Sequence, residues 1–82
     1  MKVRLRLFAN LAEYLPSSAD GDGVTLDLPD GALVSDVLAP LRIPARVPFL
    51  SVVNGHEVED TRPLHDGDEL AIFPPLSGGS VR

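Results

Sequence analysis

The chain has 82 residues, a formal net charge of −5 and no cysteine, so it supports one small domain without disulfides or thiolate metal ligands. The acidic balance argues against nucleic acid as a partner, because phosphate binding needs a surplus of lysine and arginine. No apolar run approaches the ~20 residues that cross a bilayer, and the alternating start MKVRLRLFAN does not resemble a signal peptide, so we expect a cytoplasmic protein that binds other proteins and no membrane.

The first third of the chain predicts two paired strands. In KVRLRL, at residues 2–7, valine and leucine alternate with lysine and arginine, which is the period of a strand with one face on the core. Residues 10–15 predict a short turn of helix that ends at Pro16, because proline donates no backbone hydrogen bond. Apolar residues alternate again in VTLDL, at residues 24–28, and predict a second strand that pairs back on the first.

The remainder predicts one helix and three further strands. Apolar residues at 34, 37, 38 and 41 recur at helical spacing, and Pro40 should end or distort that helix near Ala39. FLSVV, at residues 49–53, predicts a buried strand, and Asn54-Gly55 favours a tight hairpin turn into a short strand, His56–Val58. The turn DGD, at residues 66–68, precedes a last strand, Glu69–Phe73. This order indicates an α+β fold, a mixed sheet with one helix laid across it.

Three stretches of the sequence are similar to one known family. RLFANLAEYL (6–15), VVNGHEV (52–58) and above all PLHDGDELAIFPPLSGG (63–79) resemble the MoaD/ThiS sulfur carriers, in particular the MoaD branch, the small subunits of molybdopterin synthase. The similarity covers nearly the whole chain. It implies a β-grasp, or ubiquitin-like, domain over residues 1–73, with the first and last strands parallel and adjacent in the centre of the sheet. An extended tail, residues 74–82, would then project from the middle of that sheet.

The resemblance also implies a chemistry for this tail. In these carriers an activating enzyme uses ATP to adenylate the terminal glycine carboxylate, and a sulfur donor then converts it to a thiocarboxylate. This role falls on Gly79, preceded by Gly78, because bare backbone can approach a reacting centre most closely. The chain itself would bind no cofactor and would have no active site of its own. The segment that threads into the partner enzymes comprises Pro74, Pro75, Leu76 and Ser77, and its prolines keep the base of the tail extended.

The sequence departs from the family after the glycine pair. The family's chains normally end at the second glycine, whereas Gly79 is followed here by Ser80, Val81 and Arg82. The carbonyl of Gly79 is therefore part of an amide and cannot be adenylated, and Arg82 is too bulky and cationic for a channel shaped for glycine. We expect a peptidase to trim the chain after Gly79. The expected partners are this peptidase, the activating enzyme, the sulfur donor and the large subunit of molybdopterin synthase.

Other functions stay open at this point. The chain could carry sulfur for another sulfur-containing metabolite, or it could be a ubiquitin-like modifier that is joined to lysines of target proteins. A third alternative is an interaction module whose masked glycine never reacts. The mass of the protein isolated from its own cells separates these alternatives.

Several side chains have two interpretations each. Phe8 and Phe73 are either packing residues or parts of an apolar patch that docks the large subunit and the activating enzyme. His56 and His65 lack the further ligands of a metal site, so we expect surface histidines and no metal. Six carboxylates gather late in the chain: Glu57, Glu59, Asp60, Asp66, Asp68 and Glu69. They form either a solvated surface or an acidic docking edge near the tail.

Overall fold

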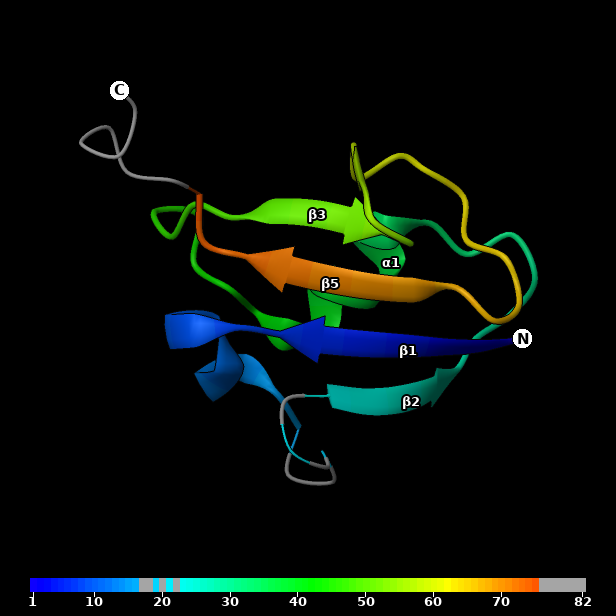
Figure 1. The fold of residues 1–82 in the computed structure, drawn as a ribbon, viewed down its shortest axis with the longest axis horizontal. Coiled ribbons are helices and arrows are strands. Elements are labelled where there is room, and N and C mark those ends of the chain that lie inside the picture. Colours follow the sequence, from blue (N-terminus) through cyan, green and yellow to red (C-terminus); the bar gives the residue numbers. More distant parts are fainter. Residues whose placement is uncertain (17–18, 20, 22, 76–82) are drawn as a thin grey trace.

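A five-stranded mixed sheet with a short helix on one face makes up the fold (Figure 1). The computed structural model describes residues 1–16, 19, 21 and 23–75. Within them, no helix is long and apolar enough to cross a membrane. The elements in chain order are β1 (Lys2–Leu7), η1 (Ala9–Tyr14), β2 (Gly23–Asp27), α1 (Val34–Leu38), η2 (Ala39–Leu41), β3 (Leu50–Val53), β4 (His56–Val58) and β5 (Glu69–Phe73), where η denotes a 3-10 helix.

The sheet has the strand order β2-β1-β5-β3-β4, so the last strand lies in the centre. β1 and β5 are parallel, with Leu5 beside Leu70 and Leu7 beside Ile72. All other pairs are antiparallel. Figure 1 shows the arrowheads of β1 and β5 on the same side of the sheet. The expected adjacency of the first and last strands is therefore confirmed, as is the β-grasp fold.

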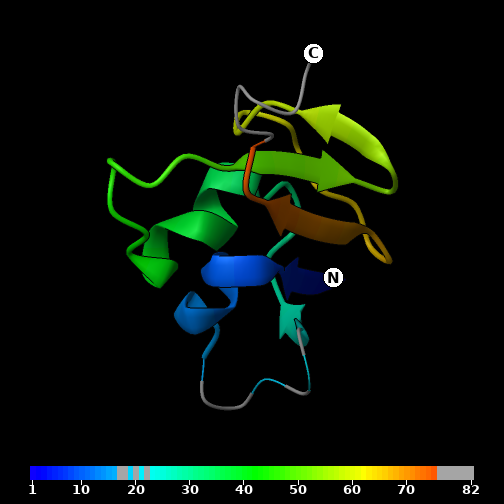
Figure 2. The ribbon, with the colours of Figure 1, turned by 60° about the vertical axis from the view of Figure 1, so that its left-hand side comes forward.

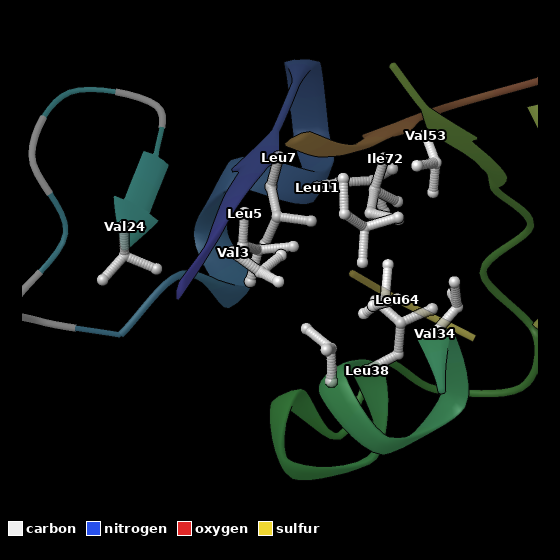
Figure 3. Close-up of a cluster of buried hydrophobic side chains, with 12 residues drawn as sticks. Val3, Leu5, Leu7, Leu11, Val24, Val34, Leu38, Val53, Leu64 and Ile72 are labelled. Atoms are coloured by element: carbon white, nitrogen blue, oxygen red, sulfur yellow. The ribbon is translucent and has the colours of Figure 1, made fainter. Parts of the chain in front are cut away.

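Strand alternation explains which face of the sheet is buried. The apolar side chains of β1 are fully buried, and their basic neighbours point to the opposite face. α1 and η2 cover the buried face (Figure 2). Figure 3 shows how side chains of the sheet meet those of α1 and of the loop before β5. The fully buried side chains are Leu5, Leu7, Leu11, Leu70, Ile72, Val3, Val34 and Val53.

The helix ends where the sequence predicts. α1 stops at Leu38 and continues only as the single turn η2, which contains Pro40. Arg42 then adopts a left-handed conformation, with φ of 58°, that closes the helix. At the other end, the carboxylate of Asp36 accepts a hydrogen bond from the Leu33 N–H at 2.8 Å. Asp36 therefore caps the helix by satisfying a backbone donor that has no partner within the helix.

Three local details differ from the prediction, and the first is that β2 spans Gly23–Asp27 and not residues 24–28. The helical turn expected at residues 10–15 is the 3-10 helix η1, which begins at Ala9 with φ of 55°. So short a segment before Pro16 favours the tighter i→i+3 bonding. The strand expected from residue 49 begins at Leu50. The turn at Asn54 and Gly55 is confirmed, with φ values of 51° and 88° that match a type I′ hairpin.

Candidate functional site

The tail leaves the sheet from the end of its central strand. Phe73, the last residue of β5, lies opposite Leu50 of β3, and the half-buried Pro74 and Pro75 follow. The structure therefore places the base of the predicted tail. The remaining tail residues assigned from the sequence, Leu76, Ser77, Gly78 and Gly79, lie outside the described residues.

Phe8 and Phe73 meet beside the base of the tail. Their rings stack with centroids 4.6 Å apart and planes 2° from parallel. The backbone holds them there, because the Phe8 N–H donates to the carbonyl of Ile72 at 3.1 Å, which continues the parallel pairing of β1 and β5. Neither ring belongs to the core cluster, and Phe73 is 36% exposed. The structure thus favours the docking interpretation over plain core packing, and docking itself stays a prediction.

The stacked pair borders a shallow hollow on the sheet face opposite the helix. The hollow has a volume of about 190 Å³. Its apolar lining includes Val52 of β3 and Ala71 of β5, which lie opposite each other in the sheet. Because Phe8 and Phe73 also line it, the hollow and the pair form one surface, which we call the outer-face patch: Phe8, Val52, Ala71 and Phe73. A partially exposed apolar surface of this kind can receive a partner's side chain.

An ion pair completes the rim of the outer-face patch. Arg6 Nη1 lies 2.9 Å from Glu69 Oε2, and both side chains are partly exposed. The guanidinium carbon of Arg6 also lies 4.9 Å from the centroid of the Phe8 ring, which is within the range of a cation–π contact. The alternation in KVRLRL predicts that Arg6 lies on the outer face of its strand, but it predicts neither contact. Both contacts depend on the parallel register of β1 and β5, which sets Arg6 opposite Ala71 and two residues from Glu69.

Three of the six late carboxylates lie away from the base of the tail, so the six do not form one continuous acidic edge beside it. Asp66, Asp68 and Glu69 lie at the start of β5, whereas the tail leaves from its end. Each of these three acids also has a local partner. Asp66 accepts a hydrogen bond from the Lys2 N–H at 2.7 Å, and Glu69 forms an ion pair with Arg6. Asp68 is only 8% exposed and accepts a hydrogen bond from the His65 N–H.

Asp68 instead stabilises the turn that begins β5. One of its carboxylate oxygens accepts the His65 N–H at 2.8 Å, and the other accepts the side-chain amide of Asn54 at 2.9 Å. Burial raises the pKa of this carboxyl, but the bonds from His65 and Asn54 outweigh burial and leave the pKa below its ordinary value. Asn54 in turn accepts the N–H of Glu69 at 3.0 Å. The network therefore fixes the β3–β4 turn to the start of the central strand.

The histidines show no metal site within the described part of the chain. His56 is exposed on the short strand β4, and His65 Nδ1 lies 3.9 Å from Asp68. Among residues 1–16, 19, 21 and 23–75, no group of three or more histidine, cysteine or acidic side chains could hold a metal ion.

A mixed five-stranded sheet with its last strand central and continuing into a tail defines the ubiquitin-like β-grasp class. Within that class the chain belongs to the ThiS family, whose model matches residues 5–79. It is 42% identical to a molybdopterin synthase sulfur carrier subunit from Chlamydomonas reinhardtii, over 96% of this chain and 100% of that protein. The name of this relative describes a carrier subunit and not a catalytic one.

Solved structures show the same fold. Small archaeal modifier protein 1 of Haloferax volcanii has a TM-score of 0.71 and 27% identity, with 92% of this chain and 98% of that chain covered. The second is one chain of a protein-protein complex of subunits 1 and 2 of the molybdopterin-converting factor from Helicobacter pylori. It has a TM-score of 0.62 at 19% identity, with 96% of this chain and 100% of that chain covered. At that identity the second likeness concerns the fold alone.

Proposed function

We propose that this protein is a sulfur carrier for molybdopterin synthesis and that Gly79, once exposed as a C-terminus, carries the sulfur. One observation supports this most directly. The family match ends at residue 79, and the tail that contains this residue continues the central strand β5 through Pro74 and Pro75. The 42% identical relative is named for the same role.

The chemistry requires a free carboxylate at Gly79. A carboxylate oxygen attacks the α-phosphate of ATP in the activating enzyme, and pyrophosphate leaves. A sulfur nucleophile supplied by the donor then attacks the acyl-adenylate carbonyl, and AMP leaves, so that the sulfur ends in a thiocarboxylate. Because Gly79 is bonded to Ser80, hydrolysis of that peptide bond by a peptidase must come first. ATP is held by the activating enzyme, and the carrier contributes only the acyl group.

The outer-face patch provides the docking surface in this proposal. It adjoins the point where the tail leaves the sheet, because Phe73 belongs to both. A partner that binds the patch therefore receives the tail beside it, and its own active site can lie where the tail reaches. The expected partners are the large subunit of molybdopterin synthase and the activating enzyme. The 42% identical relative is named as a subunit of molybdopterin synthase, which supports the first of these.

A second candidate function is that of a protein modifier. The structural likeness to small archaeal modifier protein 1 favours it. The modifier and the carrier share trimming and adenylation, but in a modifier the activated glycine ends in an amide with a lysine side chain. Transfer of sulfur to a different metabolite also shares the first two steps. An inert module with Gly79 permanently masked shares none of them.

The test compares the full chain with a variant truncated after Gly79. With the cognate activating enzyme, the truncated variant should exchange pyrophosphate with ATP, and with the sulfur donor its mass should change by one sulfur-for-oxygen replacement. The full chain should do neither. Gly79→Ala in the truncated variant serves as a matched control and should slow the transfer sharply, because a methyl group beside the reacting carbon disturbs its placement.

The outcomes separate the candidates. Thiocarboxylate formation followed by sulfur transfer to the pterin precursor on the large subunit supports the proposal. Activation that ends in lysine conjugates supports the modifier, and a truncated chain that stays inert leaves only the interaction module. Reaction of the full chain would show that trimming is unnecessary.

A further inference from the structure

Four side chains form a continuous ladder along the outer face of the sheet. Glu69 lies 2.9 Å from Arg6, Arg6 lies 4.9 Å from the centroid of the Phe8 ring, and Phe8 stacks on Phe73 at 4.6 Å. The ladder joins the start of β5 to its end by way of β1. Its last member, Phe73, is the residue from which the tail continues at Pro74.

The ladder restrains rings that the core does not hold. Phe8 and Phe73 are not members of the core cluster, and Phe73 is 36% exposed. The guanidinium of Arg6 contacts the face of Phe8, and Glu69 fixes the guanidinium. A planar guanidinium suits this position, because it stacks on a ring and bonds a carboxylate at the same time.

We propose that Arg6 and Glu69 are positioning residues for the tail: they hold Phe8, Phe8 holds Phe73, and the restrained Phe73 sets the direction in which the tail leaves the sheet. The inference rests on the proposed function, because the direction of the tail matters only if the tail must enter a partner's site. If the base of the tail is already held in its bound direction, less conformational entropy is lost when the tail binds a partner. The carboxyl carbon of Gly79 is then also placed more accurately for reaction.

The same strand provides a matched control. Lys2 and Asp27 form an ion pair between β1 and β2 at 3.2 Å, in which both side chains are largely exposed and neither belongs to the ladder. Asp27→Asn removes this pair, and with it the 3.7 Å contact of Asp27 with the N-terminal ammonium, without changing a member of the ladder. It therefore shows how much exposed ion pairs of β1 contribute by themselves, which is normally little.

The first measurement uses the free protein and does not depend on function. In NMR spectra of the full chain, Glu69→Gln and Arg6→Leu should shift the ring protons of Phe8 and Phe73 toward the values of unstacked rings. Asp27→Asn should leave these ring protons unchanged. Unchanged ring protons in both ladder variants would overturn the inference, since the ion pair would then not restrain the rings.

The second measurement is the affinity of the chain truncated after Gly79 for the large subunit, by titration calorimetry. Glu69→Gln and Arg6→Leu should each weaken binding by about threefold to tenfold, as expected for loss of a partly exposed cation–π and ion-pair contact. Asp27→Asn should change it by less than about twofold. A failure of the unsubstituted truncated chain to bind counts against the proposed function, while the ring-proton measurement still decides the inference.

A double-mutant cycle shows whether Glu69 acts through the ring. Because Glu69 contacts Arg6, and Arg6 contacts Phe8, the effect of Glu69→Gln on affinity should disappear in a Phe8→Leu background. Additive losses would mean that Glu69 contacts the partner directly, and they would overturn the positioning role.

Discussion

Replacing Asp68 tests how the central strand is anchored. In Asp68→Asn the side chain keeps its shape, but an amide group must face donors from both His65 and Asn54, where the carboxylate accepts at 2.8 Å and 2.9 Å. Hydrogen bonds to a charged group are worth about 1.5–3 kcal/mol each, and one of the two is lost or inverted. We expect the free energy of unfolding to fall by about 2–3 kcal/mol, out of about 4–12 kcal/mol for a domain of this size.

The effect of Asp68→Asn should depend on pH with a definite sign. The pKa of Asp68 is lowered in the folded state, so the carboxylate stabilises the fold above its unfolded pKa of about 4. This stabilisation is lost as the pH falls through the folded pKa. The difference in unfolding free energy between the unsubstituted protein and Asp68→Asn should therefore shrink below about pH 4.

Urea denaturation followed by circular dichroism at a series of pH values measures this difference. Asp30→Asn is the matched control, because Asp30 is an exposed acid in the loop after β2. The control should lose little stability at any pH. A gap between Asp68→Asn and the unsubstituted protein that stays constant from about pH 6 to about pH 3 would refute the role assigned to the Asp68 carboxylate.

Two further substitutions address docking and the edge of the sheet. Phe8→Asp should leave the fold intact by circular dichroism while weakening association with the large subunit by more than about tenfold in analytical ultracentrifugation, because it removes the stacked ring and places a charge in an apolar patch. Unchanged association would exclude Phe8 from the interface. Gly23→Ala should lower the free energy of unfolding by about 1–3 kcal/mol, because its Cβ would lie 2.8 Å from the backbone oxygen of Leu5. A fully stable Gly23→Ala protein would mean that β2 can shift without cost.

Much of the fold could be predicted because its determinants are local. Alternation in β1 and the spacing of apolar residues in α1 each lie within a few residues. Pro40 marked the end of the helix, since a proline ring disturbs any helix that contains it. The parallel neighbours β1 and β5 are different, because more than sixty residues separate Arg6 from its ion-pair partner. Their adjacency followed from family resemblance and not from the alternation of either strand.

The candidate site was predictable only in part for the same reason. Phe8 and Phe73 stand out in the sequence as aromatic residues at the ends of strands, but their stacking needs the register of β1 on β5. Asp68 was grouped with surface acids, because its charge is visible in the sequence while its burial is not. Arg6 is one of three basic residues that alternate along β1, and the sequence does not distinguish it from Lys2 and Arg4. Local sequence patterns therefore do not predict side-chain contacts between strands that are distant in the sequence.

The central position of β5 also governs when this protein can fold. β5 contributes the fully buried Leu70 and Ile72 and pairs with both β1 and β3. Without β5, the pair of β1 and β2 and the pair of β3 and β4 share no strand. The two pairs can therefore join into one sheet only after β5, the last strand of the sheet, has been synthesised. Contacts so distant in sequence form slowly, since loop closure precedes any gain. An incomplete chain that lacks β5 would lack both the centre of the sheet and the attachment point of the tail.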